Sequence, residues 1–250
     1  MNYIIKCGRN FAAISDIVSA ELHKHWMLQI FLNCEDNLNI EVDGKLINCN
    51  AALVNMNTVH TFNVEGKIHF TMLLDPTTQL GRLMRRRLKE KSFYVFPHKE
   101  ATVMQQNLKN VLLKRGKEAL MFFVKSIDYK FASCNIISFD ERIEEVLNLL
   151  NDYSCEDEFH QIKYLSQKMH ISESYLAHLF KKETGIPLKS YIVLRKLQRA
   201  YELIFNGENI TTAALNAGFD SSSHLAYTNK MMTGMSATNI IRDSGFLKVF

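Results

Sequence analysis

The spacing of apolar and polar residues changes along the chain near residue 77. From about Glu21 to Leu74 the two kinds alternate, and this period of two is typical of β-strands with one buried face. Leu38–Val42 follows the alternation, and Asp43-Gly44 then supplies the residues of a tight hairpin turn. Several short strands separated by turns predict a small barrel or sandwich in this part of the chain.

Helical spacing dominates after Thr77. Apolar residues recur at intervals of three and four in Leu80–Leu88 and in Lys117–Phe131, which predicts two amphipathic helices. The second stretch holds more apolar residues than one buried stripe needs, so they form either a dimer seam or part of the first domain's core. Ser138–Glu141 is a good helix start before a third such pattern, and it opens the second of two predicted domains.

An internal repeat lies in this second domain. Tyr164–Ile186 and Ala213–Met235 align at an offset of 49 residues. The helix before each turn aligns better at an offset of 48, because the second copy has one more residue in its turn. Identical pairs include Ser174/Ser223, Leu176/Leu225, Ala177/Ala226, Lys181/Lys230, Thr184/Thr233 and Gly185/Gly234.

Each copy has the residue order of a helix-turn-helix. A short helix holds a small residue where two helices cross, Ser166 in the first copy and Ala214 in the second. A turn and an apolar residue follow, and a polar residue then caps the second helix. This cap is Ser172 in the first copy and either Asp220 or Ser221 in the second. Two such units in tandem, each ending in Thr-Gly, favour a DNA-reading domain.

Through these residues the chain resembles the AraC/XylS family of transcriptional regulators over roughly Phe139–Arg242. The most specific pieces are SESYLAHLFKKETGIPLKSY, RKLQRAYEL and NAGFDSSSHL. The resemblance implies an AraC-type DNA-binding domain at 139–250, with helix-turn-helix units at about 162–185 and 210–234 joined by one long helix. It also implies a cupin-like sensor or dimerisation domain at 1–138, where LHKHWMLQIF, VDGK and NMNTVHTF look like the family's barrel. The expected fold is α+β, with an N-terminal cupin-like β-barrel with helices and a C-terminal all-α domain.

The resemblance and helical geometry together place candidate base-reading side chains on the outward face of each unit. They are Ser174 and His178 in the first unit and Ser222, Ser223 and Tyr227 in the second. None of these is Arg or Lys, although a cation on guanine is the commonest specific contact. We therefore expect modest direct readout, supplemented by DNA shape, dimerisation or a partner protein. Structural alternatives are helix capping for the serines and packing against the bridging helix for Tyr227.

Other polar residues are better placed to contact phosphates, which supply salt-dependent affinity without reading sequence. The second unit also departs from the family, because Asn229 stands where a Phe is usual. Loss of a large buried side chain typically costs ~3–5 kcal/mol, so the sequence predicts a looser second unit that DNA tightens. The expected phosphate contacts are Ser172, Lys181, Lys182, Lys189, Arg195, Lys196 and Lys230.

Four residues of the first domain, His23, His25, Gln29 and His60, follow the ligand order of metal-dependent cupin enzymes. Gln29 occupies the position of an acid and is a poor ligand for a divalent ion. No metal and no other cofactor are therefore expected, and the histidines are interpreted as strand residues inherited with the scaffold. A small effector is the other candidate ligand of this domain. The expected pocket residues are His25, Trp26, His60 and Phe62.

Charge and cysteine usage narrow the class of protein. The net charge is +4, residues 139–158 are acidic, and the basic segment after them suits a polyanionic partner. Five scattered cysteines without a CxxC pair favour reduced thiols over a disulfide scaffold. Lys6 and Arg9 break the first apolar run, unlike in a signal peptide, and no run approaches the ~18 residues that span a membrane. We therefore expect a cytoplasmic protein with no membrane partner.

Together these patterns favour a sequence-specific, DNA-binding transcriptional regulator that is not an enzyme. We expect an activator that binds double-stranded DNA as a homodimer, contacts RNA polymerase and responds to a small-molecule effector. Two alternatives stay open. One is a regulator without an effector that acts through a protein partner, and the other is a metal-dependent cupin enzyme with an appended helical domain.

Overall fold

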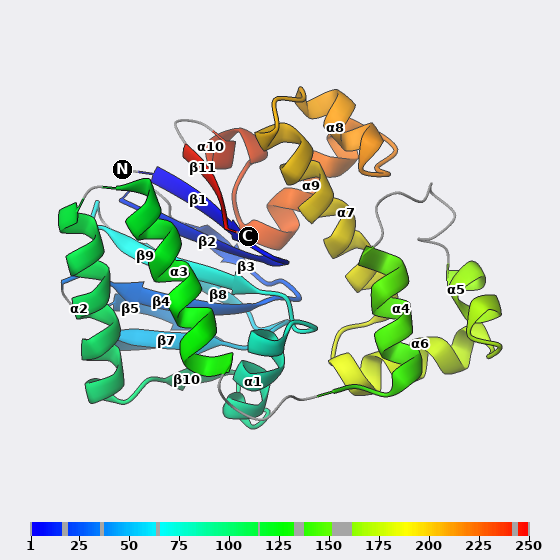
Figure 1. The fold of residues 1–250 in the computed structure, drawn as a ribbon, viewed down its shortest axis with the longest axis horizontal. Helices are drawn as coiled ribbons and strands as arrows, with labels where there is room; N and C mark the ends of the chain where they lie inside the picture. Colours follow the sequence, from blue (N-terminus) through cyan, green and yellow to red (C-terminus); the bar gives the residue numbers. More distant parts are fainter. Residues whose placement is uncertain are drawn as a thin grey trace. The chain divides into compact units, whose positions relative to one another are not determined.

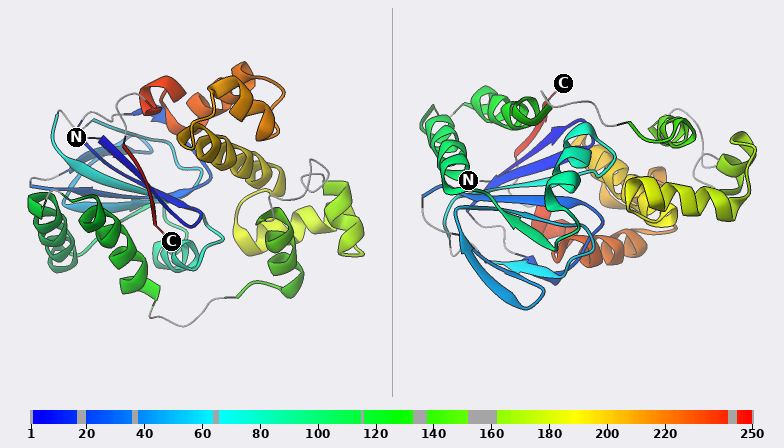
Figure 2. Two further views of the ribbon diagram at one scale, coloured as in Figure 1. Left: turned by 45° about the horizontal axis from the view of Figure 1, so that its top comes forward. Right: turned by 90° about the horizontal axis from the view of Figure 1, so that it is seen from below.

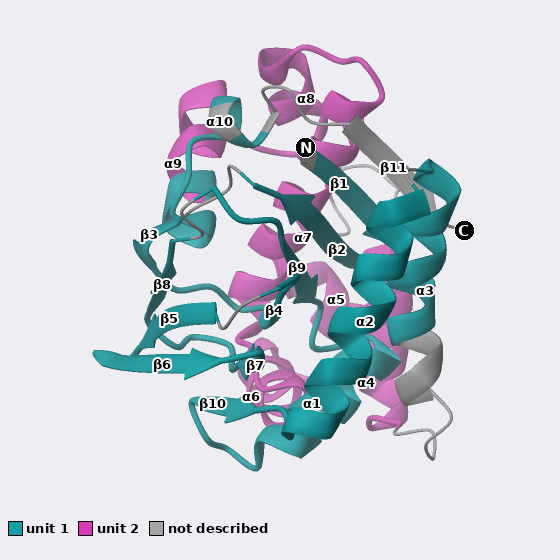
Figure 3. Ribbon diagram, turned by 90° about the vertical axis from the view of Figure 1, so that its left-hand side faces the viewer, with its two compact units in different colours: residues 1–135, 229–250 teal, residues 136–228 magenta. Residues whose placement is uncertain are grey.

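The computed structural model describes residues 2–16, 20–35, 38–63, 66–114, 116–132, 138–151, 162–241 and 245–249. The chain divides into two compact units, shown in Figure 3. Unit 1 comprises residues 1–135 and 229–250, and unit 2 comprises residues 136–228. Unit 1 contains the β-sheets and unit 2 is helical, so the predicted α+β class is confirmed.

Unit 1 is built on two β-sheets (Figure 1). The larger has the strand order β10-β7-β4-β9-β2-β1-β11, and the smaller has the order β3-β8-β5-β6. The strands of the larger sheet are β1 (Asn2–Cys7), β2 (Asn10–Ser15), β4 (Leu28–Asn33), β7 (Ala51–Val54), β9 (His69–Leu74), β10 (Phe93–Val95) and β11 (Gly245–Val249). Those of the smaller sheet are β3 (Ala20–His23), β5 (Leu38–Val42), β6 (Lys45–Cys49) and β8 (His60–Phe62).

The predicted hairpin is confirmed. Strand β5 pairs with β6 in antiparallel register along all five residues. At the turn, Asp43 and Gly44 have φ angles of 48° and 74°, the left-handed values that a two-residue hairpin loop requires. By contrast, β4 shows no alternation, because every one of its residues is buried between β7 and β9.

Three helices complete the first part of unit 1: α1 (Gln79–Leu88), α2 (His98–Lys114) and α3 (Lys117–Ala132). Helices α2 and α3 pack beside each other and against the larger sheet (Figure 1). Leu108 and Phe123 join the core there, and the Phe123 ring meets that of Phe70 edge to face at 5.2 Å. The apolar excess predicted for α3 is therefore partly core, while Phe122 stays 72% exposed.

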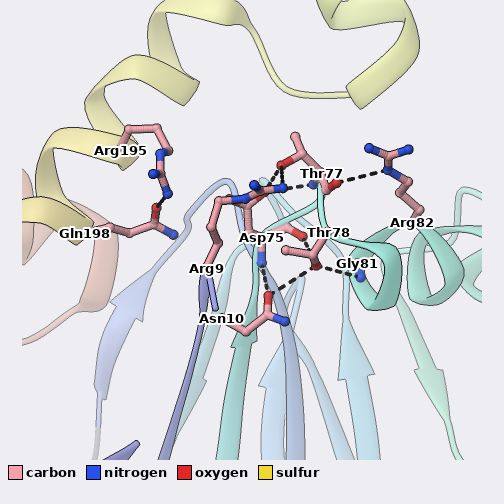
Figure 4. Close-up of polar contacts among 9 residues, drawn as sticks. All are labelled: Arg9, Asn10, Asp75, Thr77, Thr78, Gly81, Arg82, Arg195 and Gln198. Atoms are coloured by element: carbon pink, nitrogen blue, oxygen red, sulfur yellow. Dashed lines mark hydrogen bonds and ion pairs between the residues drawn. The ribbon is translucent and has the colours of Figure 1, made fainter. Parts of the chain in front are cut away.

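Buried Asp75 fixes the start of α1 after β9 (Figure 4). Its carboxylate accepts a hydrogen bond from the Thr77 N–H at 2.8 Å and lies 3.3 Å from the Arg9 guanidinium. The Thr78 hydroxyl caps the helix by accepting from the Gly81 N–H at 3.1 Å. A Cβ on Gly81 would lie 2.0 Å from the Asp75 carbonyl oxygen, so this close approach requires glycine.

Strand β11 lies beside β1 in parallel, the red and dark blue strands of Figure 2. Its pairing partners run from Tyr3 to Cys7 along the edge of the larger sheet. For this reason residues 229–250 group with the β-sheets of unit 1. The division near residue 136 lies close to the expected boundary at 138, whereas the sequence does not suggest the return of the chain to the sheet.

Unit 2 contains α4 (Glu141–Asn151), α5 (Ile162–Lys168), α6 (Glu173–Thr184), α7 (Leu188–Phe205), α8 (Ile210–Asn216) and the first half of α9 (Ser222–Thr233). The short α10 (Ala237–Ile241) belongs to unit 1. Asp140 starts α4, because its carboxylate accepts from the Arg142 N–H at 3.0 Å. The core of unit 2 includes Phe180 and Tyr191, whose ring centroids lie 5.3 Å apart.

Candidate nucleic-acid interface

The first helix-turn-helix consists of α5, a tight turn and α6. His170 reverses the chain with a left-handed φ of 54°, and the Ile171 N–H then donates to the Ser166 carbonyl at 3.1 Å. Ser166 itself is buried, and its small side chain lets the two helices approach. The Ser172 hydroxyl accepts from the Tyr175 N–H at 3.2 Å, which confirms it as the cap of α6.

Helix α6 separates an inward apolar face from an outward polar face. Leu176, Leu179 and Phe180 are buried. The outward face carries exposed Ser174, His178, Lys181 and Lys182. An inner face held by the core fixes the orientation of the outer one, so these polar side chains point away from unit 2 as a set.

The second helix-turn-helix repeats this backbone pattern with different residues. Gly218 takes the left-handed conformation at the turn, with a φ of 82°, and the Phe219 N–H donates to the Ala214 carbonyl at 2.9 Å. The Ser221 hydroxyl accepts from the His224 N–H at 3.1 Å, so Ser221 is the cap of α9. Asp220 is the additional turn residue, and its carboxylate lies 3.1 Å from His224 Nδ1.

The Thr-Gly pair closes both units in the same way. In the first helix-turn-helix the Thr184 hydroxyl donates to the Phe180 carbonyl at 2.7 Å and accepts from the Ile186 N–H. In the second the Thr233 hydroxyl donates to the Asn229 carbonyl at 2.9 Å and accepts from the Met235 N–H. Gly185 and Gly234 have positive φ angles of 80° and 67°, which end each helix.

Asn229, expected to leave a wetter core, is fully buried and hydrogen-bonded. Its side-chain amide donates to the Met235 carbonyl at 2.8 Å. A buried amide with a partner avoids most of the cost of desolvation. The second unit therefore replaces the aromatic packing of Phe180 on Tyr191 with a polar tie across its closing turn.

Four of the five base-reading candidates are exposed. Ser174, His178 and Ser223 are exposed, and Tyr227 has 68% of its surface accessible, so it does not pack against the bridging helix. Ser222 is half-buried at the start of α9. The structure also adds a residue that the sequence did not single out, because exposed Tyr175 on α6 lies under the Arg142 guanidinium at 5.5 Å.

Two of the expected phosphate contacts need correction. Arg195 is 3% exposed, and its guanidinium donates to the side-chain oxygen Oε1 of Gln198 at 2.6 Å (Figure 4). The Lys196 ammonium donates to the Gly218 carbonyl at 2.6 Å, which ties α7 to the turn of the second unit. Arg195 is buried because α7 has buried residues on several sides, whereas Lys196 is half-buried and its ammonium is held by the turn.

The other candidate phosphate contacts lie on the surface. Lys181, Lys182 and Lys189 are exposed. Ser172 is exposed as well, although its hydroxyl is used in the cap. Lys230 is exposed within unit 1, where its ammonium lies 3.5 Å from the Glu21 carboxylate.

A pocket of about 440 Å³ lies in unit 1, and it includes one of the four expected effector residues. Phe62 lines it, together with Glu21, Lys230 and Met235 among others. His25 and His60 are instead 5% and 1% exposed, and both face Gln29 in the core. His60 and Phe62 lie on the same face of β8, and Phe62 pairs with Ala20, which also lines the pocket.

Three histidines of unit 1 come together in space. His23, His25 and His60 are all buried, and each offers a ring nitrogen within 4.8 Å of those of the other two. The order of these residues is recognisable in the sequence, but a metal site was not expected because Gln29 takes the place of an acid.

Within the described part of the chain, no helix is long and apolar enough to cross a membrane.

Comparison with known proteins agrees with this geometry. Residues 165–243 match the helix-turn-helix domain family. The transcriptional regulator MxiE of Shigella flexneri is 27% identical over 188 residues, which cover 74% of this chain and 86% of MxiE. Among solved structures, apo ToxT from Vibrio cholerae has a TM-score of 0.57 at 12% identity, covering 94% of this chain and 97% of that one.

ToxT bound to an unsaturated fatty acid has a TM-score of 0.51 at 14% identity, and the match covers 95% of this chain and 92% of that one. At such identities the likeness to ToxT shows a common fold. The helix-turn-helix match supplies the DNA-binding element, and the relationship to MxiE supplies the regulatory role. The chain is therefore a DNA-binding transcriptional regulator with an AraC-type helix-turn-helix domain.

Proposed function

We propose that the chain binds specific DNA sites through the outward faces of α6 and α9, within a DNA-binding domain at about 139–250. The observation that carries this proposal is the face of α6, where Ser174 and His178 are exposed above a buried apolar face. The bridging helix α7 has 18 residues, a length of about 27 Å at 1.5 Å per residue. This is comparable to the roughly 34 Å between successive major grooves on one side of DNA.

On this proposal α6 makes more of the DNA contacts than α9. Helix α6 combines its base-reading residues with Lys181 and Lys182, and exposed Lys189 follows at the start of α7. Helix α9 offers Ser223 and Tyr227, with half-buried Ser222 beside them. Since none of the base readers is a cation, sequence-dependent DNA shape contributes much of the specificity.

Selection of binding sites from random DNA, followed by titration at several salt concentrations, tests this proposal. His178→Ala should weaken selected sites by roughly 1–3 kcal/mol and random DNA hardly at all. Lys181→Ala should weaken both alike and lower the salt dependence by about one ion. Equal losses from the two substitutions would show that His178 does not read bases, and no salt-sensitive binding to any DNA would exclude the proposal.

We further propose that the protein is a cytoplasmic homodimer and an activator that contacts RNA polymerase, rather than an enzyme. Exposed apolar side chains on α2 and α3 support the dimer, since Leu113 and Phe122 are 80% and 72% accessible. Phe122→Glu should give a monomer by light scattering, whereas Lys125→Glu on the same helix should not. Transcription in vitro with purified RNA polymerase distinguishes activation from repression.

A small-molecule effector is the third part of the proposal. ToxT, which shares the fold, has been solved with an unsaturated fatty acid. The pocket of this chain combines apolar Phe62 and Met235 with Lys230, and its volume is sufficient for a compact ligand. A ligand carboxylate would replace Glu21 as the partner of Lys230.

Oleate is a direct probe of this pocket. Titration followed by the fluorescence of Trp26, the one tryptophan of the chain, should show saturable binding that Lys230→Ala weakens and Lys189→Ala does not. DNA affinity should change over the same range of oleate concentration. Binding that is unaffected by Lys230→Ala would place the ligand elsewhere, and no binding would favour a regulator that acts through a protein partner.

A further inference from the structure

The histidine cluster of unit 1 joins the two sheets. His23 ends β3 and pairs with His60 of β8 in the smaller sheet, and their ring centroids lie 4.4 Å apart. His25 follows two residues after His23, and its centroid is 5.1 Å from that of His60. Gln29, which faces His25 and His60, belongs to β4 in the larger sheet.

Backbone carbonyls orient the rings. Nδ1 of His23 lies 2.7 Å from the Glu21 carbonyl oxygen, and Nδ1 of His60 lies 2.9 Å from that of Thr58. Nδ1 of His25 is 2.9 Å from the Met27 carbonyl, a shorter contact than the 3.3 Å to the Met27 N–H. A carbonyl oxygen only accepts, so these contacts put the proton on Nδ1 and leave the Nε2 lone pairs of His25 and His60 available, whereas His23 has a second backbone hydrogen bond, to His60. The same second contact orients histidine ligands in metal sites.

Gln29 brings a further acceptor to the same point. Its side-chain carbonyl oxygen lies 2.9 Å from Nε2 of both His25 and His60, while its NH₂ group donates to the Thr71 hydroxyl at 2.8 Å. A neutral ring has one N–H, and with that proton on Nδ1 the Nε2 atoms of His25 and His60 are acceptors as well. Three acceptor atoms therefore face one another without a proton between them.

Two arrangements satisfy these atoms. In one, the Gln29 amide is turned by 180° and its NH₂ group donates to both rings, since amide oxygen and nitrogen are assigned from the network around them. In the other, a cation lies between the acceptors. With the turned amide, Gln29 serves His25 and His60 while His23 keeps its backbone contacts to Glu21 and His60, whereas a cation would use all three histidines.

We propose that His23, His25 and His60 bind one divalent transition-metal ion through their ring nitrogens, with the Gln29 carbonyl oxygen as a fourth ligand. Neutral imidazoles suit Zn²⁺, Co²⁺, Ni²⁺ or Fe²⁺ rather than Mg²⁺ or Ca²⁺. Metal–nitrogen bonds of about 2.1 Å require ring nitrogens roughly 3.4 Å apart, so the rings, whose nitrogens lie within 4.8 Å of one another, need to close by at most about 1.4 Å. The ion would cross-link β3 and β8 to β4, and its role would be to hold the two sheets together.

The test uses the full chain without a polyhistidine tag, treated with EDTA and then titrated with Co²⁺. We expect one Co²⁺ per chain by elemental analysis, visible absorption typical of a tetrahedral site, and quenching of Trp26, the neighbour of His25. Thermal unfolding should shift upward with Co²⁺ or Zn²⁺ and remain unchanged with Mg²⁺. This measurement needs no variant, so it remains informative if a substitution prevents folding.

Variants then separate the two arrangements. His60→Ala should weaken Co²⁺ binding by more than the roughly 10–100-fold that loss of an outer partner causes, whereas His98→Ala at the exposed start of α2 should not change it. Gln29→Glu keeps the shape of the side chain and should strengthen binding, because it supplies a carboxylate. Absence of stoichiometric binding to the wild type, or metal affinity that survives His60→Ala, would overturn the proposal and leave the turned amide.

Discussion

The two helix-turn-helix units use one backbone pattern and fill it with different side chains. Both have a left-handed turn residue, a serine cap and a Thr-Gly closure with matching hydrogen bonds. The first unit places Phe180 against Tyr191, and the second places Asn229 against its own closing turn. The caps and turns therefore keep the same backbone conformation in both copies. The equivalent core position holds an apolar ring in the first copy and a hydrogen-bonded amide in the second.

The largest expected effect comes from the aromatic core of the first unit. Phe180→Ala should lower the free energy of unfolding by ~3–5 kcal/mol, because it leaves a cavity beside Tyr191. Urea denaturation monitored by circular dichroism measures this loss. A loss below ~1 kcal/mol would mean that the unit does not depend on its aromatic pair, and Phe180→Leu serves as the conservative control.

The corresponding change in the second unit should cost less. Asn229→Ala removes the donor to the Met235 carbonyl and should destabilise by ~1–3 kcal/mol, the usual cost of a buried group left without its partner. The same denaturation experiment measures it. Asn229→Leu fills the space without restoring the hydrogen bond, so recovery of stability by Leu would show that volume, and not the amide, matters there.

The two caps offer a matched pair with a smaller effect. Ser172→Ala and Ser221→Ala should each cost ~1 kcal/mol, since each hydroxyl accepts from one N–H in the first turn of its helix. Similar losses in thermal or urea unfolding would support the common frame. A much smaller loss for Ser221 would indicate that Asp220 takes over the cap.

The smallest expected difference lies in the salt dependence of DNA binding. Lys182→Ala should reduce the slope of log affinity against log salt by about 0.9, as for one lost phosphate contact. Lys230→Ala should reduce it by less, because Glu21 lies 3.5 Å from its ammonium. Titrations of both variants on the same DNA between 50 and 200 mM salt compare the two reductions in slope. Equal reductions would show that Lys230 contacts a phosphate as Lys182 does.

Local signals in the sequence predicted most of the elements of the fold. Asp43-Gly44, the Thr-Gly closures and the serine caps act within a few residues, so their types alone predicted the hairpin and the two repeated units. The amphipathic stretch at 117–131 likewise became α3. The strands β1 and β2 were not predicted, because turn and period signals before residue 21 are weak.

Contacts between residues far apart in the chain determine the features that the sequence did not predict. Lys196 had the type of a phosphate contact, but its partner is the carbonyl of Gly218, in the turn between α8 and α9. Arg195 was placed by the family pattern, whereas α7 buries residues on more sides than one amphipathic stripe. His23 and His60 lie far apart in the chain, and only the pairing of β3 with β8 brings their rings together.

The pairing of β11 with β1 gives the chain an unusual order. Unit 1 begins the chain and also ends it, so the helical unit 2 is an insertion with two covalent connections to the same body. A segment tethered at both ends samples a smaller volume than one tethered once, because closing the loop removes conformational entropy. One of these connections is helix α9 itself, because its residues from Asn229 onward belong to unit 1, so a helix and not a flexible linker forms the second tether.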